Sequence, residues 1–168
     1  MPDWLVVPSY FLHFVATVVW VGGIFLMVIV GYPGLRRALG VGAQTGAAIA
    51  ELQRRLAPLY LLSLITLGLT GLIQMSVNSN YEGFLFFGNL WSIAILLKHI
   101  AFFIMSAITA YSIWNLSPVL NRLTLLETKG RTDAGELTAL RNREERLNQL
   151  NVACALIVLL FTAIARSV

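Results

Sequence analysis

The chain contains two histidines, His13 and His99, and each lies inside a long apolar stretch. If both stretches are helices that run in the same direction, a rise of about 1.5 Å per residue places the imidazoles about 12 and 13 Å from the same membrane surface. An ionisable side chain at such a depth is costly and marks a functional site. Because two imidazoles can hold both axial positions of a b-type haem, we predict that His13 and His99 are metal ligands of haem b. The alternative, in which each imidazole only donates a hydrogen bond to a neighbouring helix, stays open.

Two cations and two glycines complete the predicted haem site. Lys98 and Arg166 lie toward the same membrane surface as the histidines. Either could neutralise a haem propionate or a substrate carboxylate, although the long side chain of Lys98 could instead extend to the surface. Gly68 and Gly71 lie at the depth of the histidines on a returning stretch, where the missing side chains leave room for a macrocycle. We therefore predict that these four residues border the cofactor.

Copper is the alternative cofactor, because thioether and thiolate ligands suit Cu(I). The candidate ligands are Met27, Met75, Met105 and Cys154, which lie at scattered depths and suit packing equally well. Cys154 is the only cysteine, which excludes a disulfide, a CxxC redox pair, a cysteine zinc site and covalent haem attachment.

The composition indicates which elements position these residues. Of 168 residues, 58% are hydrophobic and 12% are charged, which is too apolar for a water-soluble enzyme. A membrane-spanning helix needs about 20 apolar residues. Four stretches qualify, and they predict transmembrane helices at about 5–30, 56–75, 90–116 and 147–166. Because the first stretch is long and residues 1–4 carry no positive side chain, we expect it to be an anchor and not a signal peptide.

The basic residues predict an orientation. Of the twelve lysines and arginines, ten fall between the first two stretches or in residues 117–147. Loops that are rich in lysine and arginine lie on the cytoplasmic side of a membrane. We therefore predict an all-α, integral membrane, antiparallel four-helix bundle with both termini outside, formed by residues 1–168 as a single domain. Such a chain is a multi-pass protein of the cell's inner or plasma membrane. Its partner is the lipid bilayer, and nucleic acid is not expected to bind.

Residues 117–147 form the expected cytoplasmic hairpin, in which a helical extension, a turn and a second helix lead into the fourth stretch. The hairpin carries six basic and five acidic residues, and Arg141 and Glu145 have the spacing of an i,i+4 ion pair. Such balanced charge predicts a solvated hairpin and no binding site. Beside it, the side-chain amides of Asn115, Asn148 and Asn151 are expected to hydrogen-bond across helices. Tyr32 is expected to anchor the chain at the membrane boundary.

Several short runs carry a family resemblance. They are Leu12–Ala16 with Val19–Gly23, which Arg36 and Arg37 follow, and then Leu67–Leu72 and Leu96–Lys98. In character and order these runs resemble the first three helices of the CopD-like (copper resistance D) membrane family. The resemblance covers most of the chain except the hairpin, and it implies copper uptake or resistance.

A second resemblance is to the four-helix HemJ-type protoporphyrinogen oxidases, which are haem-associated. His13 and Lys98 match that family's first-helix histidine and third-helix lysine, and Arg146–Asn148 resembles the start of its last helix. The family's Asn-Glu-x-Pro-Thr run is replaced here by Asn-Gln-Leu-Asn-Val at 148–152. This departure, together with His99 as a second axial ligand beside the lysine, favours electron transfer over substrate oxidation.

The residues thus predict a membrane b-type haem protein with bis-histidine ligation, which transfers electrons or senses redox state with a membrane redox partner or as a homo-oligomer. The alternatives are copper uptake or resistance, haem-biosynthetic protoporphyrinogen oxidation, and a non-catalytic subunit of a larger respiratory or photosynthetic complex. The sequence contains no phosphate-binding loop and no constellation of a serine or cysteine nucleophile, so hydrolysis and phosphoryl transfer are not expected. Whether the chain is an enzyme stays open.

Overall fold

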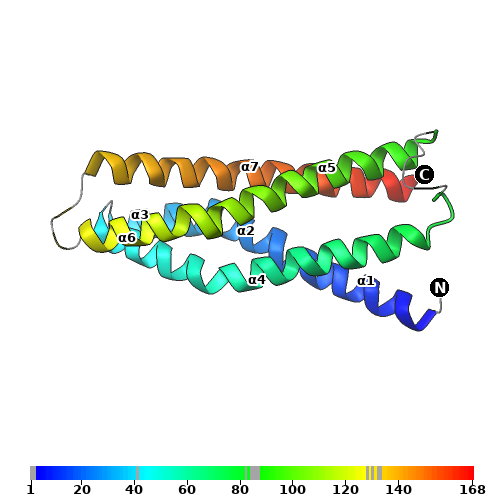
Figure 1. Ribbon diagram of the computed structural model, residues 1–168, viewed down its shortest axis with the longest axis horizontal. Coiled ribbons are helices and arrows are strands. Elements are labelled where there is room, and N and C mark those ends of the chain that lie inside the picture. The colour runs from blue at the N-terminus through cyan, green and yellow to red at the C-terminus, as the bar shows by residue number, and fades with distance from the viewer. Residues whose placement is uncertain are drawn as a thin grey trace.

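The computed structural model describes residues 3–40, 42–81, 83, 88–127, 129, 131 and 134–168, and no strand occurs in these ranges. Four long helical rods lie side by side, and the two chain ends lie at the same end of the molecule (Figure 1). We call this the termini end and the opposite one the basic end. The predictions of an all-α chain and of four helices long and apolar enough to cross a membrane are confirmed.

The first two rods join at the basic end. The first rod consists of α1 (Asp3–Thr17), η1 (Val18–Gly22), α2 (Gly23–Phe25), η2 (Leu26–Gly31) and α3 (Tyr32–Leu39), of which η1 and η2 are π-helical. It ends at Gly40, whose φ of 74° is strained for other residues. The second rod is α4 (Ala43–Ser76), which returns to the termini end.

The third and fourth rods also join at the basic end. The third rod consists of α5 (Leu90–Tyr111), the π-helical η3 (Ser112–Leu116) and α6 (Ser117–Glu127), and the fourth is α7 (Ala134–Ser167). Asn89 caps the start of α5, because its side chain accepts a 2.7 Å hydrogen bond from the backbone N–H of Ser92. The predicted start of this helix at Leu90 is therefore confirmed.

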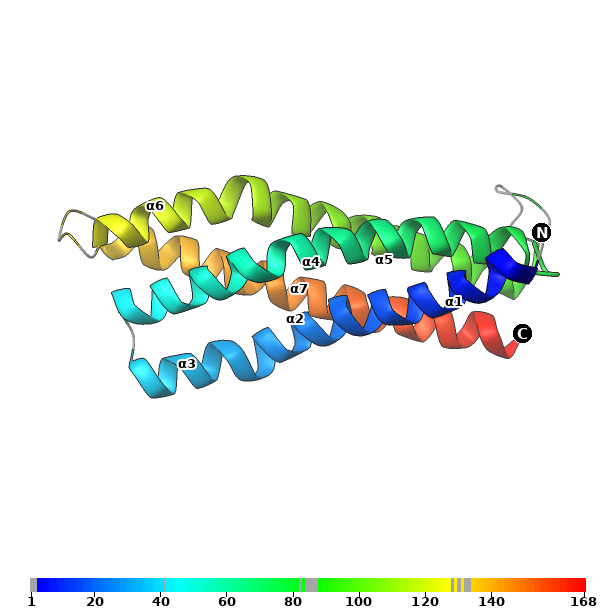
Figure 2. The same ribbon diagram turned by 90° about the horizontal axis from the view of Figure 1, so that it is seen from below.

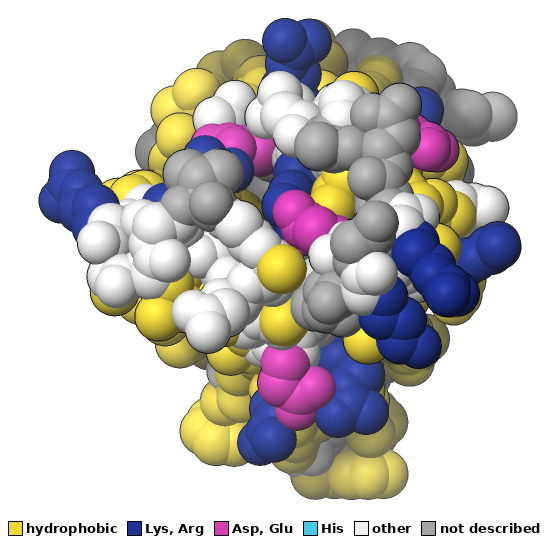
Figure 3. Space-filling view, turned by 90° about the vertical axis from the view of Figure 1, so that its left-hand side faces the viewer, with side chains coloured by type: hydrophobic (Ala, Val, Ile, Leu, Met, Phe, Trp, Pro, Cys, Tyr) yellow, Lys and Arg dark blue, Asp and Glu magenta, His cyan; other side chains and the backbone are white. Residues whose placement is uncertain are grey.

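The rods are longer than a membrane is thick. They contain 33 to 38 residues, which is about 50 Å or more of helix, against about 30 Å of hydrocarbon. The predicted apolar stretches occupy the part of each rod nearest the termini end, so the surplus extends from the basic end. Figure 3 looks onto this end, where Lys and Arg side chains stand around the rim and Asp and Glu side chains lie between them.

The outer surface of the rods is apolar. Large hydrophobic side chains on all four rods are exposed, among them Phe11 (66%), Leu62 (63%), Phe103 (66%) and Leu160 (57%). Apolar exposure on this scale would cause a water-soluble monomer to aggregate, whereas lipid solvates it. The surface therefore agrees with a protein that lies in a membrane.

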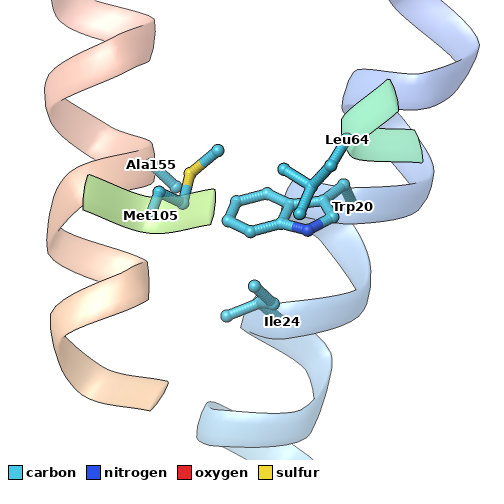
Figure 4. Close-up of a cluster of buried hydrophobic side chains, with 5 residues drawn as sticks. All are labelled: Trp20, Ile24, Leu64, Met105 and Ala155. Carbon is cyan, nitrogen blue, oxygen red and sulfur yellow. The ribbon is translucent and has the colours of Figure 1, made fainter. Parts of the chain in front are cut away.

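The core joins two helix pairs. α1 packs mainly on α4, and α5 packs mainly on α7 (Figure 2). Trp20 is completely buried and its indole ring reaches from η1 toward Met105 of α5 and Ala155 of α7, with Ile24 and Leu64 beside it (Figure 4). A second apolar cluster of Leu116, Leu120 and Leu137 closes the basic end between α6 and α7. A polar region separates the two clusters.

Two predictions about the basic end are wrong. Arg141 pairs with Glu127 of α6 at 2.8 Å, and Glu145 pairs with Arg36 of α3 at 2.8 Å, so the two do not pair with each other. The reason is that this part of α7 packs against neighbouring helices, which offer closer partners than its own next turn. Nor is the hairpin solvated throughout, because Leu137 is 1% exposed and Glu144 is 6% exposed.

Tyr32 is buried at 5% exposure, so its prediction as a membrane-boundary anchor is wrong. Its hydroxyl oxygen accepts hydrogen bonds from Gln53 at 2.8 Å and from Asn148 at 2.6 Å. The side chain of Asn151 donates a 3.1 Å hydrogen bond to Thr109 of α5. The prediction of hydrogen bonds across helices is therefore confirmed for Asn148 and Asn151. It is wrong for Asn115, whose side chain is exposed and makes no such bond within the described residues.

Candidate functional site

His13 lies on α1 and faces α4. Its Nδ1 is 2.7 Å from Thr70 Oγ1, and Thr70 Oγ1 donates its only proton to the backbone oxygen of Thr66 at 2.6 Å. Thr70 must therefore accept, and the Nδ1–H of His13 must donate. In the neutral ring this leaves Nε2 with its lone pair, which is the form of histidine that binds a metal.

His99 lies on α5 and has the same tautomer for a different reason. Its Nδ1 is 2.7 Å from the backbone oxygen of Ile95, one turn earlier in the helix. A carbonyl oxygen only accepts, so the Nδ1–H donates and Nε2 again keeps its lone pair. Both predicted ligands thus present Nε2, and each is oriented by a partner on the other ring nitrogen.

The two predicted glycines lie on α4 in different surroundings. A Cβ atom added to Gly71 would lie 3.7 Å from Cε1 of His13, which is an ordinary van der Waals contact. A Cβ atom added to Gly68 would lie 3.8 Å from the ring of Phe102 on α5. Gly71 therefore borders the histidine, whereas the open side of Gly68 faces an aromatic side chain.

The two predicted cations gather at the termini end with His13. The charges of Lys98 and Arg166 both act on the ring of His13, and the charge of Arg166 acts on Lys98. The guanidinium of Arg166 also lies over the ring of Tyr10, 5.4 Å from its centroid. Within the described ranges, the four ion pairs all involve other arginines, and Lys98 and Arg166 take part in none of them.

On α5, Lys98 lies on the face that packs into the bundle. Successive helical residues are rotated by about 100°, so Lys98 shares a face with Ala94, Ala101 and Met105, which are all buried. His99 lies about one quarter-turn further round, at the edge of this face. Lys98 and Arg166 thus lie near enough to His13 for their charges to act on its ring, and the pairing of His13 with His99 stays a prediction.

The candidate copper ligands are mostly packing residues. Met105 is 2% exposed and belongs to the Trp20 cluster, and Cys154 packs against the same cluster. Met27 is 6% exposed and lies beside Gly31. These contacts are the ones expected of sulfur side chains that fill irregular gaps in a core.

Sequence reasoning missed the polar residues that hold α1 against α4. Besides accepting from His13, Thr70 offers its backbone oxygen to the hydroxyl of Ser9 at 3.3 Å, and Gln74 donates to the backbone oxygen of Ser9 at 3.3 Å. One signal for them was available. Thr70 and Gln74 are four residues apart and are polar in an apolar stretch, so they lie on one face of the helix.

Sequence reasoning also missed a cavity at the basic end whose walls contain both apolar and polar side chains. Its volume is about 230 Å³, and all four rods contribute to its walls, with Ile24, Tyr60, Ser112 and Asn151 among the lining residues. A second cavity of about 220 Å³ adjoins it, and Ala50, Gln53, Asn121 and Glu144 line both. The asparagines were visible in the sequence, but only the fold shows that they surround a common space.

No family model matches this chain, and neither does any curated protein or any solved structure. The resemblances to the CopD-like and HemJ-type families therefore rest on the residues of the chain itself.

Proposed function

We propose that this chain is a membrane b-type haem protein in which Nε2 of His13 and Nε2 of His99 would hold the haem iron. The observation that carries the proposal is the shared tautomer of the two histidines. Both use Nδ1–H as a donor, to Thr70 and to Ile95, so both keep Nε2 for a metal. The side chains present therefore fit the cofactor in their chemistry.

The charges near His13 support the same proposal. A b-type haem carries two propionate groups, and Lys98 and Arg166 are two cations without an ion-pair partner in the described part of the chain. Their positive charges would neutralise the propionates in a region where an unpaired charge is costly. On the other side of His13, the Trp20 cluster excludes water from the middle of the bundle.

Electron transfer is the proposed activity. When bound, the haem supplies a one-electron redox couple, and ligation by two imidazoles leaves no open position for a substrate. Thr70 and the Ile95 carbonyl would hold the two rings in place, while Lys98 and Arg166 would set the local charge. A membrane redox partner, or a second copy of this chain, would exchange the electron.

The test is an absorption spectrum of protein that is purified after haem-replete expression, recorded oxidised and after reduction by dithionite. We expect the split bands of a six-coordinate b-type haem, and we expect His13→Ala and His99→Ala each to lose them. Thr66→Val is the control, because among the described residues the Thr66 hydroxyl bonds within α4, to the backbone oxygen of Leu62. Absence of haem bands, or stoichiometric copper without iron in metal analysis, would contradict the proposal and favour the copper alternative.

Protoporphyrinogen oxidation is a second candidate, and it is favoured by the position of Lys98, whose charge acts on the ring of His13. These are the two residues that carry the resemblance to the HemJ-type oxidases. Expression in a strain that lacks its own protoporphyrinogen oxidase distinguishes the two functions. Rescue that is lost in Lys98→Met but kept in His99→Ala would indicate the oxidase, and failure to rescue would leave electron transfer.

We also propose that the basic end faces the cytoplasm and both termini face outward, in the inner or plasma membrane of the cell. The support is the position of ten of the twelve lysines and arginines at that end.

A further inference from the structure

The cavity of about 230 Å³ at the basic end is lined by hydrogen-bonding groups without partners. In the described residues, four buried side-chain polar atoms have no hydrogen-bond partner, and three of them belong to residues that line this cavity. They are the Tyr60 hydroxyl, the Ser112 hydroxyl and Asn151 Oδ1. A buried polar group without a partner is costly, so their concentration around one space indicates that something else satisfies them.

The orientation of the Asn151 amide is determined by its neighbour. Thr109 Oγ1 donates its only proton to the backbone oxygen of Met105 at 2.9 Å, so it must accept the 3.1 Å hydrogen bond from Asn151. The nitrogen of the Asn151 amide is therefore the atom that faces Thr109. Asn151 is 2% exposed and leaves Oδ1 as an acceptor without a partner at the cavity. A ligand there must donate.

Glu144 adds a buried carboxyl group to the same cavity. It is 6% exposed, and no ion pair in the described ranges involves it. The nearby arginines pair with other acids, because Arg54 binds Glu51 and Arg141 binds Glu127. Glu144 is thus a carboxyl group whose negative charge has no cation bonded to it.

Glu144 lies outside the predicted membrane-spanning stretch 147–166, and burial raises its pKa to about 7. The polar and charged groups that face it or line the cavities it borders come from every neighbouring element: Tyr32 and Arg36 of the first rod, Gln53 and Arg54 of α4, Asn121 of α6, and Arg141 and Glu145 of α7. Of these, Gln53 and Arg141 oppose the effect of burial by favouring the charged carboxylate.

The spacing on α7 defines the length of a ligand. Glu144, Asn148 and Asn151 are at positions i, i+4 and i+7 and so lie along one face of the helix. The α carbons of Glu144 and Asn151 are about 10 Å apart along the axis, and the side chains of both line the cavity. Between these two ends the wall is partly apolar, from Ile24, Ala57 and Ile113.

We propose that this cavity binds a short aliphatic amine that carries a second hydrogen-bond donor at its other end, such as an amino alcohol. The ammonium group pairs with Glu144, and the second donor bonds to Asn151 Oδ1. The methylene groups lie against the apolar wall, and the hydroxyls of Tyr60 and Ser112 complete the hydrogen bonding. Where it meets the Trp20 cluster the cavity is bordered by Ile24 and Tyr60, and the proposal uses neither predicted haem ligand, so it is independent of the haem proposal.

The test is calorimetric titration of the detergent-solubilised full chain with three probes: aminobutanol with its groups at opposite ends, butylamine, and the neutral butanediol. We expect aminobutanol to bind more tightly than butylamine, and butanediol not to bind. Glu144→Gln should lower the affinity of the chain for aminobutanol by about tenfold or more. Glu136→Gln is the matched control, because Glu136 is an exposed residue on the same helix.

Two further measurements identify the roles of the residues. Asn151→Ala should lower the affinity for aminobutanol by about threefold to tenfold but leave the affinity for butylamine unchanged. Below the pKa of Glu144, the affinity of the wild-type chain for aminobutanol should rise about tenfold per pH unit, because the carboxyl must lose its proton to pair with the ammonium. Glu144→Gln should show no such rise.

A further pair of variants distinguishes loss of binding from misfolding. Ala57→Leu should fill the cavity and abolish binding while the helical content stays unchanged, whereas Ala47→Leu, at an exposed position of the same helix, should bind normally. The proposal is overturned if no probe binds, if Glu144→Gln binds aminobutanol as tightly as the wild type, or if butanediol binds as well as aminobutanol.

Discussion

His13 donates its Nδ1–H to Thr70 Oγ1 over 2.7 Å, and this bond connects α1 to α4. It orients the predicted haem ligand, because the Thr70 proton is committed to Thr66 and the imidazole must be the donor. Partners of this kind on ligating histidines alter metal affinity and ligand basicity.

The first prediction concerns this partner. Thr70→Val keeps the size of the side chain but removes the acceptor, so haem affinity should fall about 10-fold to 100-fold. Thr70→Ser restores an acceptor and should recover most of the affinity. Haem titration of the apoprotein, followed by absorbance, measures both. If Thr70→Val and the Thr66→Val control have equal affinities, Thr70 does not position the ligand.

The second prediction concerns the cations near His13. Lys98→Met and Arg166→Met should each lower the reduction midpoint potential of the haem, because a positive charge near the site favours the reduced form, which carries one more electron. Redox titration followed by the absorption bands measures the shift. An unchanged potential in both variants would mean that neither charge lies close to the cofactor.

The third prediction concerns the hydrogen bond between Asn151 and Thr109. Asn151→Ala should destabilise the bundle by about 1 kcal/mol, which is typical for a bond between membrane helices. Asn115→Ala is the control, because Asn115 is an exposed asparagine on the third rod. Thermal unfolding in detergent, followed by circular dichroism, compares them, and equal loss in both variants would argue against a specific role for Asn151.

The fourth prediction is a pH dependence. Burial raises the pKa of Glu144 to about 7 in the folded chain, above the value of 4.5 for an ordinary glutamate. The folded state therefore binds the proton more tightly than the unfolded state. The stabilisation that comes from this tighter proton binding is fully present below pH 4.5 and is lost as the pH rises through 7. The Tm should accordingly fall across this window in the wild type and in Glu136→Gln, and the fall should be smaller in Glu144→Gln. An identical slope in all three proteins would mean that Glu144 titrates normally.

The fifth prediction concerns orientation. In a Cys154→Ala background, Val168→Cys should react with a membrane-impermeant maleimide in intact cells, whereas Lys129→Cys should react only after the membrane is opened. Both positions are exposed and lie at opposite ends of the bundle. The reverse pattern would invert the proposed topology.

The sequence by itself determined the four membrane-length helices, their approximate positions and the grouping of basic residues at one end. Hydropathy over about 20 residues is a local property, because each stretch meets the same lipid whatever lies beside it. The start of α5 at Leu90 follows from the same kind of local information, since the cap from Asn89 acts within one turn. Two candidate ligands, His13 and His99, were likewise recognisable from their depth alone.

Only the tertiary structure decided which polar groups meet. Arg141 forms an ion pair with Glu127 and Glu145 forms one with Arg36, although the sequence favoured a pair between Arg141 and Glu145 within one helix. Tyr32 turns into the bundle, and Glu144 is buried in a segment whose composition suggested a solvated hairpin. The physical reason is that a charged or polar side chain on a helix can reach several neighbours, and the packing of the rods selects among them. The tautomers of His13 and His99 and the cavity at Asn151 depend on that selection.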